Sequence, residues 1–157
     1  MKVKEIMATE VVSVGPETRV NEIARLMLER QISGVPVIDD SNAVVGIVTE
    51  LDMIVRNARL HFPTYIKLLD STFYLESPQH FGEELRRALG TTAKDIMTEK
   101  VITVGPEAEV EDVATLMVEK RVNPIPVVAD GRLVGIVSRT DLIKLLIREL
   151  GPDEGAE

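Results

Sequence analysis

Two stretches of the chain carry apolar residues at intervals of three and four, with polar residues between them. That spacing places the apolar side chains on one face of a helix. In the first stretch these residues are Val20, Ile23, Ala24, Met27 and Leu28, and in the second they are Val110, Val113, Ala114, Met117 and Val118. The pattern predicts two amphipathic helices, and Thr18 is a candidate cap for the first of them.

Each predicted helix is followed by two short apolar runs that a turn separates. The runs are "VPVID" and "AVVGIV" around "DSN", then "IPVVA" and "LVGIV" around "DGR". Such pairs predict β-hairpins, and Asp-Gly is a strong turn signal. A short extended piece precedes each amphipathic helix (Val11–Val14 and Val101–Val104), and a further helix begins at Glu50 and at Arg139, the second ending near Gly151. The predicted order is strand, helix, strand, strand, helix, twice over.

The two halves of the chain are copies of each other. The string "KEIMATEVVSVGPE" (Lys4–Glu17) aligns with "KDIMTEKVITVGPE" (Lys94–Glu107). One residue is missing from the second copy in the turn after Ser41, so that Gly46 pairs with Gly135. A unit repeated in this way predicts two similar α+β subdomains that bury complementary faces against each other.

Composition excludes several classes of function. The chain has 157 residues, of which 45% are hydrophobic, so it can bury a core of aliphatic side chains. It has no cysteine and two histidines, which leaves no disulfide or thiolate chemistry and a poor set of metal ligands. The formal net charge of −8 opposes generic binding to nucleic acid or an anionic membrane. No apolar run reaches the roughly 20 residues of a membrane helix, so we expect a soluble cytoplasmic protein.

The strings "GIVTELDMI" and "GIVSRTDLI" place an aspartate three residues after a hydroxyl in both copies, as Thr49/Asp52 and Ser138/Asp141. One interpretation is a helix cap, worth about 1 kcal/mol. The other is a ligand site, because a helix start offers free N–H groups to a phosphate and a carboxylate accepts from two ribose hydroxyls. Phosphate and ribose together indicate a nucleotide.

An apolar slot for a base is predicted from "SGVPVI" and "NPIPVV". There a flat base could lie against Val35 or Ile125 and bond to main-chain groups. The alternative is that both side chains belong to the core.

The chain resembles a tandem pair of CBS domains, the cystathionine β-synthase type, also called a Bateman module. The resemblance rests on "DIMT", "VGPE", the helix, "PV" before an acid, and the hydroxyl-to-aspartate motif, over about Val3–Ile54 and Lys94–Ile147. It implies two β-α-β-β-α units packed pseudo-symmetrically through their sheets, with two clefts between them. Such pairs are not enzymes and carry no catalytic cofactor. They bind adenosine ligands (AMP, ADP, ATP or S-adenosylmethionine), regulate a partner, often in energy sensing, and form disc-like homodimers.

The resemblance also implies which residues bind the ligand. Asp52 and Asp141 match the ribose-binding acids, and Thr49 and Ser138 match the phosphate-side hydroxyls. The residues that match the frame of the adenine are Ser33, Gly34, Val35 and Pro36 in the first copy and Asn123, Pro124, Ile125 and Pro126 in the second. Ser13 and Thr103 match hydroxyls at its edge.

The copies differ after the hydroxyl, where Glu50 in the first stands opposite Arg139 in the second. A guanidinium at a helix start can pair with phosphate, whereas a carboxylate repels it. We therefore expect the Ser138/Asp141 site to bind phosphorylated adenosine more tightly. The alternative is that both are ordinary solvated residues.

The predicted domains are residues 1–55, a helical inter-repeat segment at 56–91, residues 92–150 and an acidic disordered tail at 151–157. Within the middle segment, "PTYIKLLD" and "GEELRRAL" predict two helices, and all five aromatic residues lie there. The segment could pack onto its own module or its dimer mate, or offer a docking surface to a partner.

Three functions remain open from the sequence. The first is a homodimeric module that binds an adenosine ligand and signals to a protein partner by conformational change. The second is an interaction module with empty clefts, in which capping and packing explain every motif residue. The third, a nucleic-acid-responsive regulator, rests only on basic residues of the second copy, Lys94, Lys100, Lys120 and Arg121, and the net acidity opposes it.

Overall fold

The computed structural model describes residues 1–54, 65–68, 71–74 and 91–151. Its first copy contains the 3-10 helix η1 (Val3–Glu5), helix α1 (Val20–Arg30), strands β1 (Gly34–Ile38) and β2 (Val44–Thr49), and a helical stretch at 50–54. The second contains α4 (Ala93–Ile96), α5 (Val110–Glu119), β5 (Ile125–Ala129), β6 (Arg132–Val137) and α6 (Arg139–Leu150). The predicted order of helices and hairpins is confirmed in both copies.

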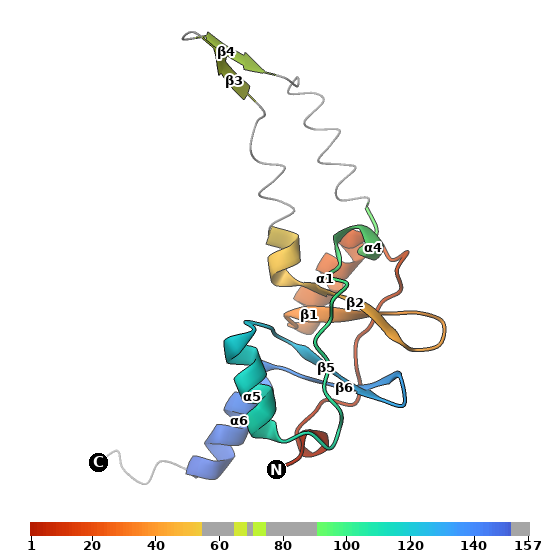
Figure 1. Cartoon of the computed structure of the whole chain (residues 1–157), viewed down its shortest axis with the longest axis vertical. Helices are drawn as coiled ribbons and strands as arrows, with labels where there is room; N and C mark the ends of the chain where they lie inside the picture. Colours follow the sequence, from red (N-terminus) through yellow and green to blue (C-terminus); the bar gives the residue numbers. More distant parts are fainter. Residues whose placement is uncertain (55–64, 69–70, 75–90, 152–157) are drawn as a thin grey trace, which may run out of the picture.

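Each copy forms one antiparallel hairpin, β1 with β2 and β5 with β6. The registers are equivalent, since Val35 lies opposite Val48 and their counterparts Ile125 and Val137 lie opposite each other. The hairpins lie together in the middle of the molecule (Figure 1), and the turn of the first is joined to β6 where the Leu133 N–H donates to the Asn42 carbonyl at 2.9 Å. The fold is therefore α+β with two small sheets.

The extended pieces expected at 11–14 and 101–104 contribute only one paired residue each, Val14 beside Val37 and Val104 beside Val127. Val14 donates to the Pro36 carbonyl at 3.0 Å and accepts from the Ile38 N–H at 2.9 Å. The next bonds of a parallel ladder would need an N–H from Pro36 on one side and from Pro16 on the other, and proline has none. Prolines at the same places in "VGPE" and "IPVV" shorten the second copy equally.

Helix α1 begins differently from the prediction. Its N-cap residue is Arg19, and the Thr18 hydroxyl accepts from the Gly15 N–H at 3.1 Å instead of capping the helix. The Val20 N–H donates to the carbonyl of Thr91 at 2.7 Å. The residue just before the second repeat therefore supplies an acceptor for the first turn of the first repeat's helix.

The two copies exchange their first segments. The Val3 and Val110 N–H groups bond to the Ala108 and Met1 carbonyls at 2.9 and 3.0 Å, which joins the start of the chain to α5. In the opposite direction, the Ala93 N–H bonds to the Thr18 carbonyl at 2.8 Å. Figure 1 shows η1 beside the second unit and α4 beside α1. The segments that contain Ile6-Met7 and Ile96-Met97 thus each pack on the other copy, and not on the copy to which they belong in sequence.

Two glycines leave the room that this exchange needs. A Cβ on Gly46 would lie 2.3 Å from Met97 Sδ, and a Cβ on Gly135 would lie 2.5 Å from Met7 Sδ. Any side chain at these positions would overlap the methionine of the other copy. The repeated "GIV" is therefore a site of close approach as well as a strand.

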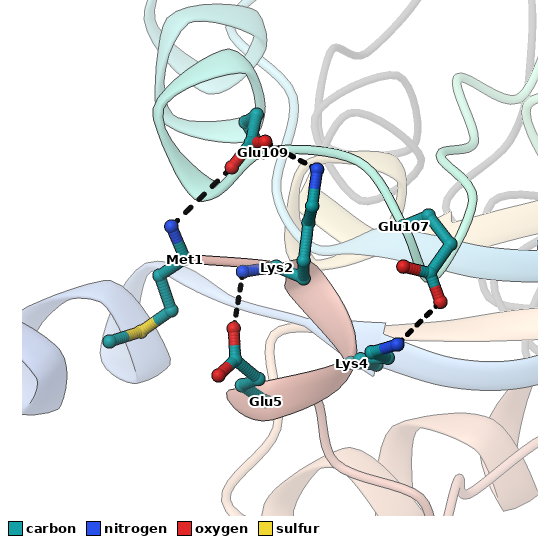
Figure 2. A network of polar contacts seen from close by, with 6 residues as sticks. All are labelled: Met1, Lys2, Lys4, Glu5, Glu107 and Glu109. Atoms are coloured by element: carbon teal, nitrogen blue, oxygen red, sulfur yellow. Dashed lines mark hydrogen bonds and ion pairs between the residues drawn. The ribbon is translucent and has the colours of Figure 1, made fainter.

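Ion pairs hold the exchanged N-terminal segment in place (Figure 2). Lys2 pairs with Glu109, and Lys4 Nζ lies 2.6 Å from Glu107 Oε1. The hydrogen bond to Lys2 lowers the pKa of Glu109, and the same bond raises the pKa of Lys2. In the other copy Lys94 Nζ lies 2.8 Å from Glu17 Oε1.

The exchange is also visible in the two cores. Ala93 lies in the core of the first unit, and Val3 lies in the core of the second. The first core holds Val14, Ile23, Met27, Val35, Val37, Val48 and Ala93; the second holds Val3, Val113, Met117, Ile125, Val127 and Val137. The segment that completes each core comes from the other repeat.

The helix predicted for "PTYIKLLD" is wrong over Tyr65–Leu68. These residues form strand β3, which pairs with β4 (Ser71–Tyr74) in an antiparallel hairpin. Tyr, Ile, Thr and Phe favour strands, and a short apolar run does not distinguish the two periods. The second predicted helix, both histidines and the acidic tail after Gly151 lie outside the described residues. We find no helix in the described ranges with the length and hydropathy that a bilayer crossing needs.

Candidate functional site

The hydroxyl-to-aspartate motif caps a helix in both copies. The carboxylate oxygen Oδ2 of Asp52 accepts bonds from the N–H and the hydroxyl of Thr49 at 2.8 and 3.1 Å. The Oδ2 of Asp141 accepts the same two bonds from Ser138 at 2.8 and 2.9 Å. The capping interpretation is therefore confirmed. It uses one oxygen of each carboxylate and leaves the other, Oδ1, directed to different surroundings in the two copies.

The first N–H group at each of the two helix starts is already bonded. The Glu50 N–H donates to the Ser33 carbonyl at 3.0 Å, and the Arg139 N–H donates to Asn123 Oδ1 at 2.9 Å. Asn123 Nδ2 also donates to the Ser33 hydroxyl oxygen at 3.0 Å. A phosphate that binds either of these N–H groups must displace its acceptor, and the Asn123 side chain can rotate away more readily than the backbone carbonyl of Ser33 can.

Cleft 1 is a cavity of about 460 Å³ with Thr49 and Asp52 on one side. Its other side comes from the second repeat. The second-repeat residues that line it are Thr98, Lys100, Val101, Ile102, Met117, Arg121, Val122, Asn123, Pro124 and Arg139. The motif of one copy therefore faces the opening segment and the end of α5 of the other.

Cleft 2 is a cavity of about 610 Å³ with Ser138, Asp141 and Lys144 on one side. Its other side comes from the first repeat, through Ala8, Met27, Leu28, Gln31, Ile32, Ser33, Gly34 and Glu50. The two clefts are related by the internal repeat, since Met27 corresponds to Met117 and Ala8 corresponds to Thr98. The exchange of segments is what builds both of them.

The structure brings together about half of the predicted site residues. Ser33, Asn123, Pro124 and Arg139 line both clefts, and Gly34 lines cleft 2. Four other residues that match the frame of the adenine are fully buried and line neither cleft; they are Val35, Pro36, Ile125 and Pro126.

The two edge hydroxyls lie elsewhere. Ser13 lines a separate cavity beside α1, and Thr103 is exposed and lines neither cleft.

The charge difference between the copies does not separate the clefts. Glu50 and Arg139 each line both cavities, because the helix starts lie next to the boundary between them. Cleft 1 adds the cations Lys100 and Arg121, whereas cleft 2 adds Lys144. Positive side chains therefore outnumber carboxylates in cleft 1 and balance them in cleft 2, which is the reverse of the expectation from Glu50 and Arg139 alone.

Sequence reasoning missed the residues of the exchanged segments, Thr98 and Ala8 above all. A signal was present, because "IMAT" and "IMTE" stand at equivalent places in the two copies. Nothing in their spacing, however, places either segment beside the aspartate of the other repeat.

The chain is similar in sequence to known proteins. A family model for the CBS domain matches residues 3–58 and 93–148. The uncharacterized protein MJ1426 of Methanocaldococcus jannaschii is 38% identical over 156 residues, which cover 94% of this chain and 92% of that protein. The chloroplastic CBS domain-containing protein CBSX2 of Arabidopsis thaliana is 29% identical over 144 residues, and the match spans 86% of this chain and 58% of that protein.

Solved structures agree with the fold. The structure of CBSX2 in complex with AMP has a TM-score of 0.71 at 25% identity and covers 96% of this chain and 98% of its own. The CBS domain pair of protein MJ0100, solved with 5′-methylthioadenosine and S-adenosyl-L-methionine, has a TM-score of 0.70 at 24% identity, covering 94% and 100%. Stand-alone CBS pairs are non-catalytic regulatory modules. The chain belongs to the CBS domain family and carries two tandem CBS domains, which cover most of its length.

Proposed function

We propose that this CBS pair is a regulatory module that binds an adenosine ligand in the clefts between its two units. The observation that carries the proposal is the double use of Asp141. Its Oδ2 holds the helix cap, Oδ1 accepts no hydrogen bond from the described residues, and the residue lines a cavity of about 610 Å³. A carboxylate oxygen with both lone pairs available is suited to a ribose diol. The complex of CBSX2 with AMP supports this ligand class.

The apolar walls of the clefts suit the base. In cleft 2, Met27, Ile32 and Ile136 are available, and Met117, Val122 and Ile47 are their counterparts in cleft 1. These side chains replace Val35 and Ile125 as the surface on which an adenine would lie. The cations Arg139 and Lys144 then face the phosphate of a nucleotide, or the carboxylate of S-adenosylmethionine, in cleft 2.

The two clefts favour different adenosine ligands. The excess of cations in cleft 1, from Lys100, Arg121 and Arg139, favours ADP or ATP there, because each added phosphate brings negative charge. Cleft 2 offers the freer carboxylate to ribose and suits AMP or S-adenosylmethionine. The ligand regulates by binding one conformer of the pair better than another, since its differential affinity sets the shift.

Replacing each aspartate by alanine tests the ligand. We expect calorimetric titration with AMP to show that Asp141→Ala weakens binding at cleft 2, and Asp52→Ala at cleft 1, by about tenfold or more, because each removes a charged acceptor. Asp40→Ala, in an exposed turn, is the control and should leave AMP binding unchanged. If AMP, ATP and S-adenosylmethionine all fail to bind or to raise the melting temperature, the chain is instead an interaction module with empty clefts.

We also propose that the pair forms a homodimer through its helices. Helix α6 buries none of its residues, and four of its large apolar side chains are more than half exposed. They are Ile143, Leu146, Ile147 and Leu150. Leu28 of α1 and Val118 of α5 are 81% and 77% exposed. Apolar faces of this extent mark an interface, and the family commonly forms disc-like dimers.

A charge on α6 tests the dimer. We expect Ile147→Asp to convert the dimer into a monomer in light scattering after gel filtration, because an interface cannot bury the unpaired carboxylate. Ser41→Asp adds the same charge to an exposed turn and should leave the mass unchanged. A native chain that is monomeric at all concentrations would contradict the proposal.

A further inference from the structure

We propose that Thr98 makes the two clefts unequal in their selectivity for ribose. Its hydroxyl occupies the second carboxylate oxygen of Asp52, so cleft 1 distinguishes ribose from deoxyribose less strongly than cleft 2 does. This inference rests on the proposed function, because it concerns adenosine ligands in the same clefts.

The contact is direct, although it is longer than the usual O–H···O distance. The Thr98 hydroxyl donates to Asp52 Oδ1 at 3.3 Å. The backbone of Thr98 is paired with Ile47 on β2, with N–H to carbonyl distances of 2.9 and 3.0 Å in the two directions. The two bonds hold the residue at the edge of the hairpin, and the exchange of segments carries it to the aspartate of the other copy.

The second cleft provides an internal comparison. Ala8 is the counterpart of Thr98, and its backbone is paired with Ile136 at 2.9 and 3.0 Å. It lines cleft 2 together with Asp141, as Thr98 lines cleft 1 together with Asp52. The backbone arrangement is therefore the same in the two clefts, and the side chains differ by a hydroxyl and a methyl group.

The number of acceptor sites left on each carboxylate gives the consequence. An ionised carboxylate has about four lone-pair sites. The cap uses Oδ2 in both copies, so Asp141 keeps two sites on Oδ1 for the two ribose hydroxyls. Asp52 keeps one, because Thr98 uses the other. A second ribose hydroxyl in cleft 1 has to displace the Thr98 hydroxyl. A ligand that lacks this ribose hydroxyl therefore loses less affinity in cleft 1 than in cleft 2.

The experiment exchanges the two side chains in proteins that retain one working cleft. Asp141→Ala leaves cleft 1 and Asp52→Ala leaves cleft 2, with Asp→Asn variants as substitutes if either alanine variant fails to fold. Calorimetry measures the affinity for AMP and for 2′-deoxy-AMP, and the readout is their ratio. Thr98→Val is added to the cleft 1 protein, because valine keeps the shape and removes the hydroxyl. Ala8→Thr is added to the cleft 2 protein, with Ala8→Val as the control for size.

We expect Thr98→Val to raise the AMP affinity of cleft 1 about threefold to tenfold and to increase its preference for AMP over 2′-deoxy-AMP, because the Thr98 hydroxyl no longer competes for the carboxylate. Ala8→Thr should lower both quantities in cleft 2 more than Ala8→Val does. An unchanged ratio in Thr98→Val, or a loss of AMP affinity, overturns the inference while AMP binding itself stands. Absence of AMP binding by the native chain overturns the proposed function, and the inference with it.

Discussion

Replacing Val3 by aspartate is expected to destabilise the second packed unit, although Val3 belongs to the first repeat. Its side chain is 0% exposed and lies in the core with Val113, Ile125 and Val137. A carboxylate there has no partner and loses its hydration, so we expect a loss of about 3 kcal/mol or more in the free energy of unfolding. Denaturant unfolding followed by circular dichroism measures this loss.

The matched control is Thr9→Asp, which places the same charge on an exposed residue of the same segment. It should change the unfolding free energy by less than about 0.5 kcal/mol. Hydrogen exchange then locates the damage. In Val3→Asp the amides of β5 and β6 should lose more protection than those of β1 and β2. Greater loss in β1 and β2 would show that the segment packs on its own repeat.

Replacing Gly34 by alanine is expected to force apart the contact between the two hairpins. A Cβ at this position would lie 2.6 Å from Pro124 Cδ and 3.3 Å from the Val48 carbonyl oxygen. A proline ring and a strand carbonyl cannot move aside as a flexible side chain can, so the strands themselves must shift. We expect a loss of about 1–3 kcal/mol, measured by denaturant unfolding.

Two other glycines test whether the rigidity of the neighbouring atoms sets the cost of an added Cβ. Gly15→Ala should cost little, because among the described residues a Cβ there meets only the Thr18 hydroxyl, at 3.9 Å. Gly46→Ala brings contacts of 2.3, 2.7 and 3.1 Å with Sδ, Cγ and Cβ of Met97, but a new rotamer of this flexible side chain relieves the two shorter ones. Its cost should therefore be smaller than that of Gly34→Ala. The opposite order would mean that the exchanged methionine is held more rigidly than the hairpin contact.

Local patterns sufficed for much of the fold. The helical spacing from Val20 to Met27 and the Asp-Gly turn before β6 each act over a few residues, so the sequence identified α1 and the second hairpin directly. The prediction failed at Tyr65–Leu68, where four residues cannot show a period. It overestimated the first strands because it did not count the N–H groups that Pro16 and Pro36 lack.

The sequence by itself determined the repeated units, the helices and hairpins, and the Thr49/Asp52 and Ser138/Asp141 caps, because all of these depend on residues a few positions apart. Only the tertiary structure decided which segment completes which core, and therefore which residues face each aspartate. Val3 and Ala93 are apolar and would suit the core of either repeat. The pattern of apolar residues therefore does not reveal which core each of them joins. The difference between Thr98 and Ala8 acquires a chemical meaning only because bonds to Ile47 and Ile136 bring these residues into the clefts.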